Sequence, residues 1–156
     1  MLSIIYDFGD EFINLGPLTL SLILFFGGKF FRKRYPFSKV VSGRLLIVIS
    51  YFTFAVFLLR DLIPYIQIRN AYHTKRYKTV EGVVENYIPI TPGTGYAHER
   101  FTVKGVFFHY ANNDYSYGYD CAASNGGVIK ANLSVKINYI HNGEKNLILV
   151  LEVKNK

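Results

Sequence analysis

The chain is poor in the residues that build disulfides, metal centres and active sites. Its only cysteine, Cys121, excludes an internal disulfide. The four histidines show no i, i+4 pair and no spacing typical of a metal site, so neither a metal nor another cofactor is expected. Five side chains offer polar chemistry, but no motif places them together: Asp120, Cys121, His98, Glu99 and His109. We therefore expect a protein that is not an enzyme.

Acidic side chains are absent from residues 29–44, the most basic segment of the chain. This segment carries six basic residues: Lys29, Arg32, Lys33, Arg34, Lys39 and Arg44. Residues 60–78 add a net charge of +4, residues 1–11 carry −3 and residues 79–156 are neutral, within a total of +7. The excess positive charge lies beside apolar segments, where anionic lipid head groups are the expected partner. A nucleic-acid-binding protein would carry its basic patch on the folded domain, so nucleic acid is not an expected partner.

Two long runs have no charged residue. Residues 12–28 and residues 45–59 form them, with 17 and 15 residues. A helix that spans a bilayer needs about 20 mostly apolar residues. The runs reach that length as helices over about 12–31 and 45–68, the second continuing through Arg60 and Asp61. We therefore predict a transmembrane hairpin within residues 1–68. Two buried helices of a soluble protein would need a larger core than the remaining residues can supply.

The charge pattern also predicts an orientation in the membrane. Basic loops stay in the cytoplasm, so residues 29–44 should face it. The acidic N-terminus and residues 79–156 should then lie outside the cytoplasm. The basic stretch at residues 60–78, which includes the juxtamembrane linker at residues 69–78, argues for the opposite orientation. We expect a multi-pass protein of the bacterial inner membrane with an extracytoplasmic β domain.

After residue 78 the pattern changes to alternation of apolar and polar residues. Expected strands cover residues 79–88, 100–103, 106–110, 115–120, 133–140 and 146–153. Lys104-Gly105 and Asn142-Gly143 are typical of tight turns. Six short strands in 78 residues suggest a closed SH3-like or OB-like barrel, or a small sandwich. The predicted fold class is therefore an α+β membrane protein, with two transmembrane helices followed by a small antiparallel β domain over residues 79–156.

Tyrosines are the most prominent side chains of this predicted β domain. Tyr115, Tyr117 and Tyr119 share one face if residues 115–120 form a regular strand. Tyrosine is enriched at protein interfaces because it joins apolar area to a hydroxyl group, so this face is a candidate binding surface. The alternative is that these rings pack in the core.

Several segments together resemble a known group of proteins. They are Val80-Glu81-Gly82-Val83-Val84, Phe101-Thr102-Val103-Lys104-Gly105-Val106, Gly126-Gly127-Val128-Ile129, Val135-Lys136-Ile137-Asn138-Tyr139 and residues 146–153. The chain resembles bacterial membrane-anchored proteins of unknown function in which a small β domain follows a transmembrane hairpin. The resemblance implies an inner-membrane protein and assigns no site residue.

Two functions fit these observations. The first is a membrane-anchored interaction module, of the envelope-accessory or immunity type, whose β domain binds a partner protein through strand edges or tyrosines. The second is a membrane-anchored sensor whose β barrel binds a small molecule and whose helices oligomerise. A homo-oligomer is compatible with both functions.

Overall fold

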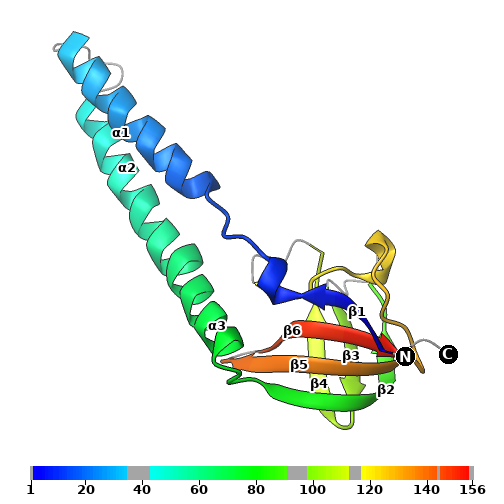
Figure 1. Cartoon of the computed structure of the whole chain (residues 1–156). Coiled ribbons are helices and arrows are strands. Elements are labelled where there is room, and N and C mark those ends of the chain that lie inside the picture. The colour runs from blue at the N-terminus through cyan, green and yellow to red at the C-terminus, as the bar shows by residue number, and fades with distance from the viewer. Residues whose placement is uncertain (1, 35–42, 91–97, 113–116, 144, 155–156) are drawn as a thin grey trace. The chain divides into compact units, whose positions relative to one another are not determined.

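The computed structural model describes residues 2–34, 43–90, 98–112, 117–143 and 145–154. Its elements are β1 (Leu2–Asp7), the 3₁₀ turn η1 (Phe8–Asp10), α1 (Gly16–Arg34), α2 (Gly43–Phe57), the π-helical turn η2 (Leu58–Leu62), α3 (Ile63–His73), β2 (Lys78–Ile88), β3 (Glu99–Val103), β4 (Val106–Tyr110), the 3₁₀ turn η3 (Ala123–Asn125), β5 (Ser134–Asn142) and β6 (Lys145–Lys154) (Figure 1).

The chain folds as two compact units. Residues 1–11 and 68–156 form the first, which contains the sheet and is called the β unit below. Residues 12–67 form the second, which is helical. The helical unit is therefore an insertion into the sequence of the β unit, between β1 and β2.

The ends of α1 follow from its sequence. The side chain of Asn14 accepts a hydrogen bond from the backbone N–H of Gly16 at 2.9 Å. Pro17 lies in the first turn, where its missing N–H costs nothing. Arg32, Lys33 and Arg34 occupy the last turn, where positive charge complements the helix dipole.

A π-helical turn joins α2 to α3 without ending the helix. Pro64 has no N–H to donate to the carbonyl of the preceding turn, so the regular hydrogen-bond ladder cannot continue there. The N–H of Ile63 instead donates to the carbonyl of Leu58, one residue further back than in an α-helix. The result is one continuous helix over Gly43–His73.

The six strands form one antiparallel sheet in the order β1-β6-β5-β2-β3-β4. β1 pairs with β6 from Leu2↔Lys154 to Asp7↔Val150, with a register shift between Ile4 and Tyr6. This pairing makes β1 one edge of the sheet, and β4 is the other (Figure 1).

Two of the predicted turns are confirmed. Lys104 and Gly105 connect β3 to β4 with φ angles of +47° and +78°, as the tight turn of a hairpin requires. Asn142 ends β5, and Gly143, with φ of +63°, leads toward β6.

The main core cluster of the β unit lies on one face of the sheet, whereas β6 is buried on both faces from Leu147 to Leu151. Apolar side chains that alternate along the strands meet there: Val80, Val84, Phe101, Val103, Phe108, Tyr110, Val135, Ile137, Tyr139, Ile148, Leu151 and Val153. Phe101 and Phe108 stack with 5.2 Å between their ring centroids.

The prediction of two transmembrane helices is wrong. In the part of the chain that the structure describes, only the helix Gly43–His73 is long and apolar enough to cross a membrane. The first uncharged run is helical only from Gly16, and Lys29 follows it. Its helical part, residues 16–28, is therefore 13 residues long. Such a segment covers about 20 Å, whereas the hydrocarbon core is about 30 Å thick.

The prediction of a closed barrel is also wrong, because the sheet is open. Within the described ranges no ladder joins β1 to β4. The edge strand β4 instead approaches β6 through a side chain, since Asn146 Nδ2 donates to the carbonyl of Phe107 at 2.9 Å.

The predicted strand at residues 115–120 is not found in its described part, Tyr117 to Asp120. Gly118 has a φ of +108°, and a Cβ at this position would lie 3.0 Å from the carbonyl oxygen of Ile148. Such a backbone cannot follow a regular strand. The sixth strand is β1, in the acidic N-terminal segment, where the sequence reasoning expected none.

Candidate functional site

Burial in the helical unit is the reverse of that in a soluble helical hairpin. In α1 the only buried residues are Ser21 and Gly28, and in α2 they are Gly43, Ser50 and Phe57. Large apolar side chains point outward instead: Leu20, Leu22, Ile23, Phe26, Phe30, Phe31, Leu45, Val48, Ile49, Tyr51, Phe52, Phe54 and Val56. An apolar outer surface of this extent marks contact with lipid or with another protein.

Small residues let the two helices approach closely. A Cβ on Gly28 would lie 2.8 Å from the carbonyl oxygen of Gly43, and a Cβ on Gly43 would also collide with the backbone of Gly28. Ser21 lies seven residues before Gly28, and Ser50 lies seven residues after Gly43. Both serines face the line of contact between α1 and α2, called the seam below. Each serine donates its hydroxyl to a carbonyl of its own helix. Contact through small residues at this spacing is typical of helix pairs packed in membranes.

The predicted basic residues flank this seam. Lys29, Arg32, Lys33 and Arg34 lie in the last two turns of α1, and Arg44 lies in the first turn of α2. The ammonium group of Lys29 lies 4.4 Å from the ring centroid of Phe25. Lys39 lies outside the described residues.

The predicted tyrosine face is divided by the structure. Tyr119 is 7% exposed, and its ring packs edge-on against Tyr110 at 5.3 Å and Tyr6 at 5.7 Å. Tyr117 is half-buried against Phe8. Tyr115 lies outside the described residues. Tyr119 therefore belongs to the core of the β unit and not to its surface.

A tyrosine–carboxylate cluster, made of Tyr6, Tyr87, Glu99, Tyr110 and Tyr119, fills part of that core. Glu99 is fully buried; one of its carboxylate oxygens accepts from Tyr110 Oη at 2.5 Å and the other from the N–H of Ala123 at 2.9 Å. Burial and the hydrogen bond to Glu99 raise the pKa of Tyr110 above its ordinary value. Burial and the Glu99 charge raise the pKa of Tyr87 to about 12. Burial likewise raises the pKa of Tyr119 to about 12, and burial beside Glu11 raises that of Tyr6.

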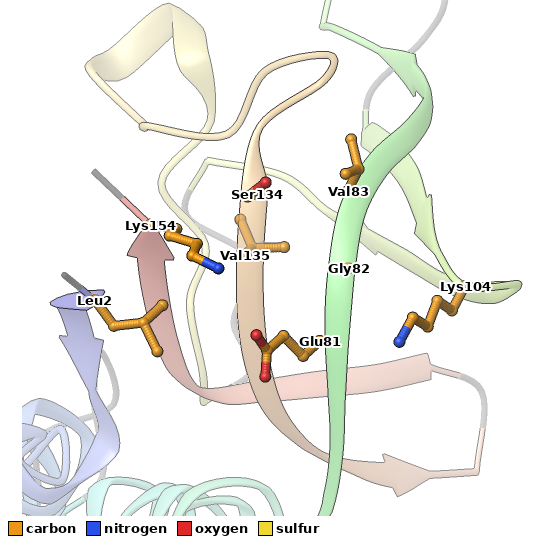
Figure 2. Close-up of a pocket in the computed structure, with 8 residues that line it drawn as sticks. All are labelled: Leu2, Glu81, Gly82, Val83, Lys104, Ser134, Val135 and Lys154. Atoms are coloured by element: carbon orange, nitrogen blue, oxygen red, sulfur yellow. The ribbon is translucent and has the colours of Figure 1, made fainter. Parts of the chain in front are cut away.

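The opposite face of the sheet is charged and carries a hollow of about 310 Å³. Its lining residues are Leu2, Glu81, Gly82, Val83, Lys104, Ser134, Val135 and Lys154. Figure 2 shows the two lysines reaching over the strands from opposite sides, with the Glu81 carboxylate between them. This surface offers positive charge on both flanks of an acceptor, an arrangement suited to a polar partner with acidic groups.

A short ladder of charges borders the hollow. Lys136 on β5 forms an ion pair of 2.9 Å with Glu152 on β6 and is the register partner of Glu81 on β2. The hydrogen bond that Lys136 donates to Glu152 raises the pKa of Lys136. Lys104 and Lys154 form no ion pair within the described part of the chain.

The edge strand β1 exposes apolar side chains that sequence reasoning did not single out. Ile4 is 64% exposed, Ile5 42% and Leu2 37%. The run Leu2-Ser3-Ile4-Ile5-Tyr6 is rich in residues that favour strands. Its apolar residues do not alternate, however, and its partner strand lies about 150 residues away, so the sequence did not predict a strand there.

The polar candidates from the sequence are only partly brought together. The rings of His98 and His109 meet at 5.6 Å, and Cys121 Sγ donates to the carbonyl of Asn125. Among the described residues, no group of three His, Cys, Asp or Glu side chains is placed to hold a metal ion.

Comparisons with protein-family models, with curated proteins and with solved structures found no match to this chain. The resemblance to bacterial membrane-anchored proteins therefore stays a prediction.

The seam between α1 and α2 can be tested with two neighbouring glycines. Gly28→Ala should lower the unfolding temperature of the helical unit, because its Cβ meets the backbone of α2. Gly27→Ala is the matched control, because a Cβ there has nothing within 4 Å. It should be neutral or stabilise the helix by up to about 1 kcal/mol. Far-UV circular dichroism in one detergent measures the unfolding temperature of both variants. Equal changes in the two variants would show that α1 and α2 do not pack through Gly28.

The tyrosine–carboxylate cluster predicts a loss of stability at alkaline pH. Its hydroxyls keep their protons in the folded chain above the ordinary pKa of 10.0, to about 12 for Tyr87 and Tyr119. The unfolded chain releases these protons first, so stability is complete below about pH 9 and falls as the pH rises from about 10 to about 12. Each tyrosine contributes a slope of up to about 1.4 kcal/mol per pH unit.

Urea unfolding of the full chain at a series of pH values, followed by the near-ultraviolet signal of the core, measures this slope. Tyr119→Phe should reduce this slope by the contribution of one tyrosine, up to about 1.4 kcal/mol per pH unit. A free energy of unfolding that stays constant to about pH 11 would show that the cluster does not bind its protons more tightly in the folded state.

Proposed function

We propose that this chain is an integral protein of the bacterial inner membrane that presents its β unit as a non-catalytic protein-interaction module. The observation that carries the proposal is the reversed burial of the helical unit, with small residues inside and large apolar side chains outside. In water this surface would aggregate, whereas in lipid it is the favourable arrangement.

The anchor is the helix Gly43–His73, with α1 packed along it. Its central run at residues 45–59 has no charge, and basic residues lie beyond both ends. Arg44 precedes the run, while Arg69, Lys75, Arg76 and Lys78 follow it. Such residues contact anionic head groups at the two membrane surfaces.

The β unit lies outside the cytoplasm in this proposal. The segment at residues 29–44 has the greatest basic excess, and it adjoins the first end of the helix Gly43–His73. The positive-inside rule places that end in the cytoplasm. Residues 68–156 of the β unit follow the other end. Residues 1–11 join them on that side, because α1 runs along the anchor and brings the chain from β1 to the first end of the helix Gly43–His73. The partners are therefore envelope proteins or secreted proteins, as for an envelope accessory or an immunity protein.

The partner surface is the charged face of the sheet around the hollow. Val83 lines the hollow and is 42% exposed, and Lys104 and Lys154 line it from two sides. Charged groups of this kind steer a complementary partner and fix its orientation. The partner is therefore a protein segment with acidic side chains that lies across β2, β5 and β6.

Photo-crosslinking in living bacteria tests this proposal. A photoreactive amino acid at Val83 should give one discrete protein adduct in alkali-washed membranes, whereas the same group at the exposed Lys130 should not. The double variant Lys104→Glu, Lys154→Glu should reduce the adduct about tenfold. Equal adducts from both positions, or recovery of the chain in the alkaline wash, would contradict the proposal.

The volume of the hollow also favours the second function predicted from the sequence, that of a membrane-anchored sensor of a small molecule. About 310 Å³ lies at the lower end of the range for small-ligand sites. A membrane-anchored sensor would bind an anionic small molecule between Lys104 and Lys154. Protection of Val83 by added pyrophosphate, with no protein adduct, would favour this function over the first.

A further inference from the structure

We propose that two copies of this chain associate through their β1 strands, which pair antiparallel and extend the sheet from one copy into the other. This inference concerns the free edge of the sheet and does not depend on the partner proposed for the charged face. It rests on the exposure of β1, on the contrast with the other edge, and on charge.

β1 presents an apolar edge with few of the features that protect edge strands. No charge and no proline occurs from Leu2 to Tyr6. The register shift between Ile4 and Tyr6 leaves two successive isoleucines, Ile4 and Ile5, exposed. An edge strand of this kind is a template for another strand, since its outer backbone groups and apolar side chains find partners together.

The other edge is protected. The carbonyl of Phe107 on β4 accepts a hydrogen bond from the side chain of Asn146, and the ring of Phe107 stacks on His109 at 5.6 Å. A new strand along β4 would have to displace the Asn146 side chain. Among the described residues, β1 is therefore the less protected of the two edges.

The charges at the two ends of β1 identify the occupant as a second copy. Asp7 ends the strand and Asp10 follows it, whereas at the other end Leu2 lies beside Lys154 of β6. If two β1 strands pair antiparallel about Ile4 and Ile5, the acidic end of each meets the basic end of the other. Lys154 and the Asp7 of the other copy are then two strand spacings apart, roughly 10 Å, because β1 of the first copy lies between them. Charges at this distance still attract each other at physiological ionic strength. A two-fold axis between the copies brings the acidic and basic ends together at both ends of the paired strands.

The experiment is a measurement of mass for the full chain in detergent by sedimentation equilibrium. The unmodified chain should have the mass of two copies. Ile4→Lys places a charge in the centre of the new pairing and should raise the dissociation constant at least about tenfold. Phe107→Lys makes the same change on the other edge and should leave the dimer intact.

A second readout does not depend on the stability of a charged variant. In a Cys121→Ala background, the double variant Ile4→Cys, Ile5→Cys should give a covalent dimer on mild oxidation, because the pairing places position 4 of one copy opposite position 5 of the other. Phe107→Cys should give none. A single copy at all concentrations tested would overturn the proposal. So would a dimer that survives Ile4→Lys with no covalent dimer from the double cysteine variant, which would place the contact elsewhere, such as on the helices.

Discussion

The pairing of β1 with β6 is the constraint on which the rest of the molecule depends. Residues 2–7 lie beside residues 150–154, so the beginning and the end of the described chain meet in one sheet. The helical unit is thereby an insertion that leaves the β unit after residue 11 and returns to it at residue 68. The hydroxyl of Tyr72, near the point of return, donates to the Asp7 carboxylate at the end of β1 and so ties the two junctions together.

The β unit compensates for its modest size with polar contacts inside its core. Glu99 is buried, and it is held by a tyrosine hydroxyl and a backbone N–H. Truncating one such partner leaves a buried carboxyl group short of a donor, which costs more than the hydrogen bond contributes when it is intact. The sequence left open whether the tyrosines form a binding face or pack in the core, and Tyr119 serves this core. The surface for partners falls instead on the charged face and on the edge at β1.

Local patterns in the sequence predicted the local structure well. Alternation located β2 to β6, and Lys104-Gly105 identified the hairpin between β3 and β4. The errors arose where a distant residue decides the outcome. Ser3 and Ile4 form a strand because Val153 and Glu152 lie beside them, and Gly118 leaves the strand conformation beside Ile148. Closure of a sheet is likewise a long-range property, so alternation alone did not distinguish an open sheet from a barrel. The hollow, which joins residues from β1, β2, β5 and β6, has no signature in a linear sequence.

The central claim is that the helix Gly43–His73 lies in lipid, and spin labelling of the full chain in vesicles tests it most directly. Labels are placed on single cysteines at Val48 and Phe52, which are 63% and 69% exposed, and at Val83 on the sheet, in a Cys121→Ala background. The account predicts that the labels at Val48 and Phe52 collide with oxygen and are shielded from a water-soluble nickel complex, while the label at Val83 shows the reverse. Equal access of the nickel complex to all three positions would contradict it.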